Sequence, residues 1–357
     1  MANTKALIAM SGGVDSSVAA YLMQQAGADC IGATMQLCDC AILGQDHLPD
    51  SVADAQNIAC KLGMQFHVLD HTADFRKYVV DQFIRCYEQG GTPNPCVDCN
   101  RHIKFDVLLQ DALALDCDCI VTGHYAKIEK DPDTGRCLLY RAGDKSKDQS
   151  YFLSCLTQEQ LARVQFPLGA LTKEQVREIA EQQGFLNARK RDSQDICFIP
   201  DGDYRAFMER YTGKHYPAGD FLDQAGNIIG KHTGAVGYTI GQRKGLGIAM
   251  GEPVYVCCKD MENNTVTVGA DADLYKAALR ASSWNWIAIP ELTEPIRVTA
   301  KIRYRHNEQP ATVYPEENGA ARVVFDQPQR AITTGQAVVL YDGDLVIGGG
   351  TITEVLE

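Results

Sequence analysis

The feature that most constrains this chain is residues 10–18, Met-Ser-Gly-Gly-Val-Asp-Ser-Ser-Val. They follow an apolar run, Ala6 to Ala9, and open a run of small and apolar residues, which predicts a strand, a tight turn and a helix. Two adjacent glycines allow a sharp turn and bring backbone N–H groups close to an anion. The helix N-terminus adds partial positive charge, and three serines add hydroxyls. We interpret the stretch as a phosphate-binding site.

The kind of phosphate site follows from what the string lacks. A Walker loop needs Gly-x-x-x-x-Gly-Lys-Ser/Thr, and the sequence contains no such string. The Ser-Gly-Gly-x-Asp-Ser-Ser pattern resembles the PP-loop of ATP pyrophosphatases, which split ATP into AMP and pyrophosphate while they adenylate a carbonyl oxygen. The alternative is a plain turn between strand and helix, with Asp15 or Ser16 as the helix cap. The whole string, placed after a strand, favours nucleotide binding.

Length and composition bound the class of protein. A chain of 357 residues predicts two or three domains, and 45% hydrophobic with 22% charged residues is typical of a globular protein. We found neither a signal-peptide pattern nor an apolar run long enough for a membrane span, so we expect a cytoplasmic protein without a membrane partner. The 14 cysteines are therefore expected to be reduced. The net charge of −12 disfavours generic binding of polyanions, although local basic clusters such as 301–305 can override it.

The order of strand-like and helix-like segments divides the chain into three parts. Through the first two hundred residues these segments alternate, which predicts a Rossmann-like, doubly covered parallel sheet whose ligands bind beyond the carboxyl ends of the strands. Residues 172–175 form a capping-box pattern for a helix. Glycines become frequent after residue 201, and short alternating segments after residue 275 predict a small barrel. We expect a nucleotide domain at 1–200, a small central domain at 201–274 and a β-barrel at 275–357.

Two cysteine segments are candidates for chemistry. Cys96 and Cys99 form a Cys-x-x-Cys that the neighbouring prolines predict to lie in a loop before a helix from Phe105 to Leu115. A zinc site would need two more ligands, for which Cys38 and Cys40 are the nearby candidates. Cys197 follows Ser-Gln-Asp-Ile, and a single cysteine is more often a small buried apolar residue than a nucleophile.

The combination of motifs is more specific than any one of them. In order, these are Ser11-Gly12-Gly13-Val14-Asp15-Ser16, Asn94-Pro95-x-x-x-Cys99-Asn100, Gly123-His124-Tyr125, Asp148-Gln149-Ser150-Tyr151, Ser193-Gln194-Asp195-Ile196-Cys197-Phe198, Gly237-Tyr238-Thr239-Ile240-Gly241-Gln242-Arg243, Lys301-x-Arg303-Tyr304-Arg305 and Gly335-Gln336-Ala337. The set resembles the bacterial tRNA-specific 2-thiouridylase family over essentially the full chain. The resemblance implies an adenine-nucleotide α-hydrolase-like α/β domain, a central domain and a tRNA-binding β-barrel.

The resemblance also implies a reaction, the 2-thiolation of the wobble uridine, position 34 of tRNA. ATP, with Mg²⁺, adenylates the C2 oxygen, Cys197 carries a persulfide, and Cys99 is the facing nucleophilic thiol that can close a disulfide with it. The sulfur would come from a sulfur-relay protein or a cysteine desulfurase. Both cysteines would have to react as thiolates, so each needs a depressed pKa or a nearby base.

The site residues implied by the resemblance fall into three groups. The ATP contacts are Ala9, Met10, Ser11, Gly12, Gly13, Val14, Asp15, Ser16, Met35 and Gly123. The target-base contacts are Asn94, Pro95 and Cys96, and the tRNA contacts are His124, Lys147, Asp148, Gln149, Arg303, Tyr304 and Gln336. The alternative for His124 is a strand-end histidine bonded to backbone.

One position departs from the family pattern, and it leaves a second mechanism open. Many family members carry Asp where this chain has Cys96, and a thiol supplies no permanent carboxylate. Either Cys96 is a tolerated substitution, or Cys96, Cys99 and Cys197 hold a 4Fe-4S cluster with an open iron, as in related PP-loop thiolases. Two further classes remain as alternatives: a PP-loop nitrogen-transfer synthetase, which needs no paired cysteines, and a tRNA-binding or cluster-binding protein without catalysis.

Overall fold

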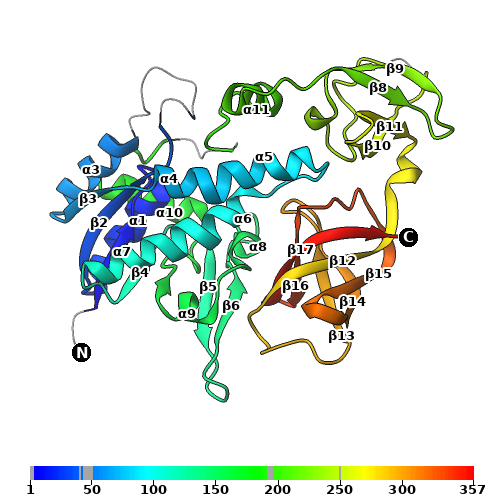
Figure 1. The fold of residues 1–357 in the computed structure, drawn as a ribbon. Coiled ribbons are helices and arrows are strands. Elements are labelled where there is room, and N and C mark those ends of the chain that lie inside the picture. Colours follow the sequence, from blue (N-terminus) through cyan, green and yellow to red (C-terminus); the bar gives the residue numbers. More distant parts are fainter. Residues whose placement is uncertain (1–3, 40–41, 43–50, 191–195, 249–250) are drawn as a thin grey trace.

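The strands of the protein form three sheets in a computed structural model that describes residues 4–39, 42, 51–190, 196–248 and 251–357 (Figure 1). The first sheet is entirely parallel, as the alternating segments predicted. In spatial order its strands are β3 (Gln65–Asp70), β2 (Asp29–Gln36), β1 (Lys5–Ala9), β4 (Cys119–Val121) and β7 (Val164–Gln165). The helices α1 (Val14–Gln25), α3 (Ser51–Lys61) and α10 (Lys173–Gln182) belong to this layer. The first part of the chain is thus a Rossmann-like domain.

The helix α10 begins where its capping box predicted. The Thr172 hydroxyl accepts from the Gln175 N–H at 3.3 Å, and the Gln175 side-chain oxygen accepts from the Thr172 N–H at 2.8 Å. Because both bonds satisfy amide groups that a helix start leaves unpaired, they hold the first turn of α10 in place. The next residue, Lys173, is thereby held at a fixed point beside the first sheet.

The segment that carries Cys96 and Cys99 is helical, so the predicted loop is wrong. Helix α6 (Pro95–Cys99) runs directly into the π-helix η2 (Asn100–Val107) and then α7 (Leu108–Ala114). Pro95 occupies the first helical turn, where a missing N–H costs nothing and the fixed φ is suited to the helix. The prolines that suggested a loop therefore start the helix. Helix α6 is preceded in the chain by three consecutive helical segments: α4 (Thr72–Phe75), η1 (Arg76–Val80) and α5 (Asp81–Glu88).

The middle of the chain contains a small sheet of four strands. They are ordered β10 (Tyr255–Asp260), β11 (Thr265–Gly269), β8 (Gly219–Leu222) and β9 (Ile228–His232), with β11 and β8 parallel. Helix α11 (Tyr204–Thr212) precedes this sheet, and the short 3-10 turns η3 (Ala235–Gly237) and η4 (Asp271–Leu274) lie within the same part of the chain.

The C-terminal strands close into an antiparallel barrel, which confirms the predicted barrel. Their order is β12 (Tyr275–Trp286), β15 (Ala321–Arg330), β14 (Gln309–Pro315), β13 (Ile296–Lys301), β16 (Ala337–Asp342) and β17 (Leu345–Leu356), and β17 pairs back with β12; η5 (Glu317–Gly319) joins β14 to β15. The hairpin β5 (Ala126–Lys130) and β6 (Cys137–Arg141) extends this sheet from β17, although it belongs to the N-terminal part of the sequence.

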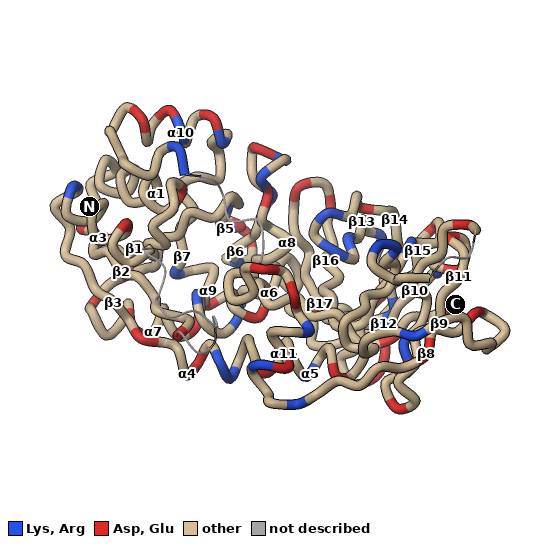
Figure 2. Tube along the Cα trace, turned by 90° about the horizontal axis from the view of Figure 1, so that it is seen from above, with Lys and Arg blue, Asp and Glu red and all other residues tan. Residues whose placement is uncertain are grey.

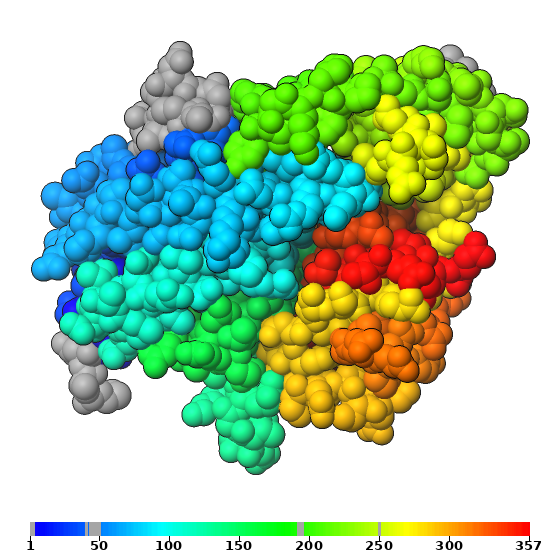
Figure 3. Space-filling view, in the orientation of Figure 1, coloured from blue at the N-terminus to red at the C-terminus, as the bar shows by residue number. Residues whose placement is uncertain are grey.

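The N-terminal domain and the barrel share one hydrophobic core. Leu7, Phe105 and Tyr151 cluster with the barrel residues Ile287 and Tyr341, all of them buried. The short helices α8 (Ser150–Leu153) and α9 (Gln158–Ala162) lie between the two. In Figure 3 the cyan part of the chain borders the red and orange C-terminal part. In the parts of the chain that the structure describes, no helix has both the length and the apolar character needed to cross a membrane.

Candidate active site

The glycine-rich turn lies at the carboxyl end of β1, where the parallel sheet was expected to bind its ligand. Gly12 has φ of +70°, and a Cβ there would lie 2.6 Å from the Ser51 carbonyl oxygen, so only glycine fits. The Ser16 hydroxyl accepts from the Ser11 N–H at 3.2 Å and donates to the Gly13 carbonyl at 3.1 Å. These bonds hold the turn in one conformation before any ligand arrives.

Three side chains from distant parts of the sequence fix this turn. The Lys173 ammonium lies 2.7 and 2.8 Å from the two carboxylate oxygens of Asp15, which also accepts from the Tyr125 hydroxyl at 2.8 Å. The Asn187 amide donates to the Gly12 carbonyl at 3.1 Å and to the Ser17 hydroxyl at 2.9 Å. Sequence reasoning missed Lys173 and Asn187, because the local signal at Lys173 indicated only a helix start.

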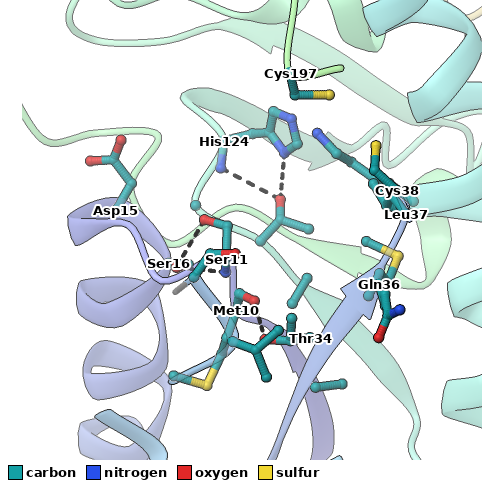
Figure 4. A pocket seen from close by; sticks show the side chains of 18 of the residues that line it. Met10, Ser11, Asp15, Ser16, Thr34, Gln36, Leu37, Cys38, His124 and Cys197 are labelled. Atoms are coloured by element: carbon teal, nitrogen blue, oxygen red, sulfur yellow. Dashed lines mark hydrogen bonds between the residues drawn. The ribbon is translucent and has the colours of Figure 1, made fainter. Parts of the chain in front are cut away.

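A cavity of about 690 Å³ opens from the turn (Figure 4). Most of the predicted ATP contacts line it, namely Ala9, Met10, Ser11, Asp15, Ser16, Met35 and Gly123. Gly12, Gly13 and Val14 are not in its lining and instead form the turn behind it. A Cβ at Gly123 would lie 2.7 Å from the Asp15 carbonyl carbon, so this glycine lets the two loops pack closely. The volume falls in the usual range of small-molecule sites, about 300–1,000 Å³.

The thiol of Cys197 faces the same cavity. Figure 4 shows Cys197, His124 and Cys38 around its upper part and Ser11, Ser16 and Asp15 around the turn. Cys197 is solvent-accessible, whereas Cys99 is buried in the adjoining core. The two cysteines lie near each other, since the charge of Cys197 is among the causes that raise the pKa of the Cys99 thiol. The fold therefore brings together two predicted thiols separated by almost a hundred residues.

The pKa values of these two thiols are raised, whereas the reaction needs both cysteines as thiolates. Burial raises the pKa of the Cys99 thiol to about 12; the surrounding protein atoms desolvate the Cys197 sulfur although the residue is exposed, and this, followed by the nearby Cys96, raises the pKa of its thiol. The opposing influence is the Lys104 ammonium, which lowers the pKa of both. Of the two requirements stated above, a depressed pKa is not met at either thiol, because burial outweighs the cation, and the need for a nearby base stays a prediction.

Lys104, which influences both thiols, is carried by the π-helix η2. Turns of a π-helix close over five residues rather than four, which places Lys104 one turn beyond Cys99. Lys104 also lines the cavity. Sequence reasoning missed this residue, since the usual helical period of 3.6 residues places it on another face.

Two other cysteines lie near these thiols. Burial, then the charges of Cys197 and Cys99, raise the pKa of the Cys38 thiol, which also lines the cavity. Burial raises the pKa of the Cys96 thiol, and Lys104 opposes this. Cys40, the other cysteine considered for a zinc site, and the motif residues 193–195 fall outside the described residues.

The predicted target-base residues begin helix α6 rather than line the main cavity. Asn94 is the residue before Pro95, and it lines a second, smaller cavity together with Val97 and Asp98 of α6. The side chain of Gln336 donates to the carbonyls of Thr92 and Pro93 at 3.0 and 2.9 Å, so it ties the start of α6 to the barrel.

The remaining predicted tRNA contacts occupy different environments. His124 lines the main cavity, pairs with the Thr122 hydroxyl at 2.7 Å, and has a strongly lowered pKa because of burial and then Lys104. Gln149 lines the same cavity and accepts from the Tyr125 N–H at 3.0 Å. Asp148 is buried, and its carboxylate accepts from Ala142 N–H at 3.0 Å and the Ser150 hydroxyl at 2.8 Å, so it shapes its own loop.

The basic residues of the predicted tRNA surface come from the barrel and from the loop before Asp148. Figure 2 shows Lys and Arg gathered around β13 and β16. Arg303 is half-buried and donates to the Arg330 carbonyl at 2.9 Å, while the Tyr304 ring packs on Phe152 with centroids 4.4 Å apart. Lys147 is also half-buried, on the loop before Asp148. The roles of these residues in tRNA binding stay predictions.

Fold and cavity together define a class, a Rossmann-like HUP-domain protein joined to a PRC-barrel domain and a β-barrel. Three families match: the tRNA methyl transferase HUP domain at residues 4–201, the tRNA methyl transferase PRC-barrel domain at 205–270 and the aminomethyltransferase beta-barrel domain at 276–352.

Full-length relatives narrow the class to a family. The tRNA-specific 2-thiouridylase MnmA of Clostridioides difficile is 49% identical over 99% of both chains. The enzymes of the same name from Acetivibrio thermocellus and Heliobacterium modesticaldum are 48% and 49% identical, over 99% and 98% of this chain and 100% and 93% of theirs. The chain belongs to the tRNA-specific 2-thiouridylase family.

Proposed function

We propose that the protein is a tRNA-uridine 2-sulfurtransferase, which uses ATP to replace the C2 oxygen of the wobble uridine by sulfur. The observation that carries the proposal is that the Cys197 thiol and the glycine-rich turn face one cavity. A sulfur donor and an activated α-phosphate must meet at the same carbon, and this arrangement supplies both. Such a reaction belongs where tRNA is found, which agrees with the expected cytoplasmic location.

In the proposed reaction, the turn residues 11–16 bind the ATP phosphates through backbone N–H groups and hydroxyls. The C2 oxygen of uridine attacks the α-phosphorus, the bond to the β-phosphate breaks, and pyrophosphate leaves. Asp15 is held by Lys173 and Tyr125, so the loop does not have to reorganise when the phosphates change.

The sulfur step follows on the adenylated base. The terminal sulfur of a Cys197 persulfide adds to C2, the C2–O bond breaks and AMP leaves. Cys99, as thiolate, attacks the Cys197 sulfur, so that the S–S bond breaks, sulfur stays on the base and a Cys99–Cys197 disulfide forms. A dithiol reductant then reopens that disulfide. A sulfur-relay protein or a cysteine desulfurase would supply the persulfide.

The raised thiol pKa values fit a mechanism in which reactivity depends on substrate binding. Lys104 is the cation next to Cys96, Cys99 and Cys197, and displacement of water from the cavity strengthens its interaction with a sulfur anion. We infer that Lys104 favours the thiolate once the cavity is filled.

A metal centre is the alternative for the same thiols. Among the described residues, no group of three or more His, Cys, Asp and Glu side chains is arranged to hold a metal ion. We derive no step through a 4Fe-4S cluster on Cys96, Cys99 and Cys197, and the cluster stays an alternative that the experiment below tests. Mg²⁺ is proposed only as the companion of the ATP phosphates.

The deciding experiment is nucleoside mass spectrometry of unmodified tRNA after incubation with ATP, a persulfide donor and chelator-treated, iron-free protein. We expect 2-thiouridine at the wobble position, none from Cys99→Ser or Cys197→Ser, and normal yield from the control Cys60→Ser on the exposed face of α3. Product that requires anaerobic iron-sulfur reconstitution would replace the persulfide route by the cluster.

The same reaction tests the two other classes of function. Full activity of Cys99→Ser and Cys197→Ser would favour nitrogen transfer. Absence of tRNA-dependent pyrophosphate release would favour a binding protein without catalysis.

A further inference from the structure

The wall of the main cavity carries a thiol, Cys38, that the proposed reaction does not use. Cys38 and Cys197 both line this cavity, whereas Cys99 does not. Cys99 is buried, Cys38 is half-buried and Cys197 is exposed. Cys38 and Ile196, the residue before Cys197, pack against the buried cluster that contains Cys99. In Figure 4 the Cys197 sulfur points toward the side of the cavity where Cys38 lies. The three thiols thus form one group, of which two members are open to the cavity.

The position of Cys38 is fixed by the residues on either side of it. Cys38 follows β2, whose carboxyl end lies beside that of β1 and so beside the glycine-rich turn. The next residue, Asp39, accepts from the Arg76 guanidinium at 3.0 Å and from the Ile42 N–H at 2.7 Å. These contacts hold Cys38 at the cavity wall. A thiol held in this way can meet a neighbouring sulfur with little loss of conformational freedom.

The proposed reaction ends in a disulfide with one inaccessible sulfur. When Cys99 attacks the Cys197 sulfur, the protein is left with a Cys99–Cys197 disulfide that a dithiol has to reopen. The rate of such a reduction depends on which sulfur is attacked and on access to it. Because Cys99 is buried, only the Cys197 sulfur can be attacked from solution. A disulfide between two cysteines that line the cavity would offer both of its sulfurs.

We propose that Cys38 takes over this disulfide from Cys99 by thiol–disulfide exchange. The Cys38 thiol loses its proton to solvent and attacks the Cys197 sulfur, the Cys99–Cys197 bond breaks, and Cys99 leaves as a thiolate that is then protonated. One S–S bond replaces another, so the exchange needs no oxidant or reductant. A dithiol then reduces the Cys38–Cys197 disulfide and is itself oxidised. The inference rests on the proposed function, because that function produces the Cys99–Cys197 disulfide.

The charges around Cys38 set the order of the two steps. Burial, then the charges of Cys197 and Cys99, raise the pKa of the Cys38 thiol. A persulfide anion on Cys197 therefore keeps Cys38 protonated during the sulfur step, and Cys99 is the thiol that resolves the persulfide. Once Cys99 and Cys197 share a disulfide, neither carries a charge. Burial and the Asp39 carboxylate still raise the pKa of Cys38, but two causes of its high value are gone, so its thiolate becomes more accessible.

The first test maps disulfides in the full-length protein without RNA, ATP or a persulfide donor. Oxidised glutathione is added to accept the two electrons of thiol pairing, and cross-linked peptides are identified by mass spectrometry without reduction. We expect a Cys38–Cys197 pair in the wild type and in Cys99→Ser. Cys38→Ser should lose this pair and keep Cys99–Cys197, and the control Cys60→Ser should give the wild-type pattern. Absence of the Cys38–Cys197 pair from both the wild type and Cys99→Ser would overturn the inference.

The second test separates the first turnover from later ones. With persulfide-loaded protein in excess over tRNA, Cys38→Ser should form as much 2-thiouridine as the wild type, because Cys99 and Cys197 complete that turnover. With tRNA in excess and little dithiothreitol, its rate should fall by a factor of about two or more, because one of two accessible sulfurs is lost. More dithiothreitol should restore the rate through attack on Cys197. Cys38→Ala should behave in the same way, which excludes an effect of the serine hydroxyl.

Two kinetic results would contradict the exchange. One is an equal multiple-turnover rate for wild type and Cys38→Ser at every dithiothreitol concentration. The other is a lower single-turnover yield from folded Cys38→Ser, because Cys38 would then act before the disulfide forms. The outcome is separable from that of the proposed function: a Cys38–Cys197 pair in protein that forms no thiouridine supports the exchange and rejects the function. Normal thiolation without this pair rejects the exchange and leaves the function intact.

Discussion

The ion pair between Lys173 and Asp15 gives the sharpest test of how the nucleotide turn is held. Its two partners differ in burial: the Lys173 side chain is 7% exposed and that of Asp15 is 31% exposed. Removing one partner of a buried pair usually costs about 3–5 kcal/mol, because the other charge is left without compensation. Removing the partner of the more buried charge should therefore lower the free energy of unfolding more than removing the partner of the less buried one.

We therefore expect the two halves of the pair to be unequal. Asp15→Ala leaves the ammonium in an almost dry site, and should lower the free energy of unfolding by about 3–5 kcal/mol. Lys173→Met leaves a partly solvated carboxylate that still accepts from the Tyr125 hydroxyl, and should cost about 1–2 kcal/mol. The double variant should lose less unfolding free energy than the sum of the two single variants, and its loss should be close to that of Lys173→Met alone.

The assay is guanidinium unfolding of each variant without nucleotide, with Lys190→Met as control. Lys190 and Asp54 also lie 2.7 Å apart, but their side chains are 48% and 39% exposed, so breaking this pair should cost less than about 1 kcal/mol. If Asp15→Ala cost no more than Lys173→Met, or if both matched the control, burial would not be the source of the pair's contribution.

Three further predictions follow from single residues. Gly12→Ala should abolish ATP binding, measured by calorimetry, because the new Cβ would collide with the Ser51 carbonyl at a positive φ; retained affinity would show that the turn adapts. Burial lowers the pKa of Lys259 to about 8, so between about pH 8 and 10.5 the folded protein binds fewer protons than the unfolded chain. The free energy of unfolding should therefore rise with pH across that window. Lys259→Met should remove this rise from the pH profile of stability. Alkylation of Cys197 by iodoacetamide, followed by peptide mass spectrometry, should be slow at pH 7 and accelerate as pH rises, with the profile moved to higher pH in Lys104→Gln; an unmoved profile would mean that Lys104 acts elsewhere.

The linear sequence determined the local features and the class of protein. The Ser-Gly-Gly-x-Asp-Ser string indicated the strand, the turn and the helix, because the preference of glycine for a positive φ and the unpaired amides at the helix start are local properties, although distant side chains then fix the turn. The capping box at Thr172 and the alternation of segments in the first part were readable for the same reason. A resemblance carried by ordered motifs gave the family.

What depended on distant contacts was decided by the tertiary structure. The prolines near Cys96 suggested a loop, whereas packing of α6 against the core and barrel made them the start of a helix. The π-helix that turns Lys104 toward the thiols has no counterpart in the 3.6-residue period. Lys173 and Asn187 reach the turn from more than 150 residues away, and burial sets the thiol pKa values. Each of these depends on which surfaces meet in three dimensions, and sequence periodicity records only which residues are neighbours along one element.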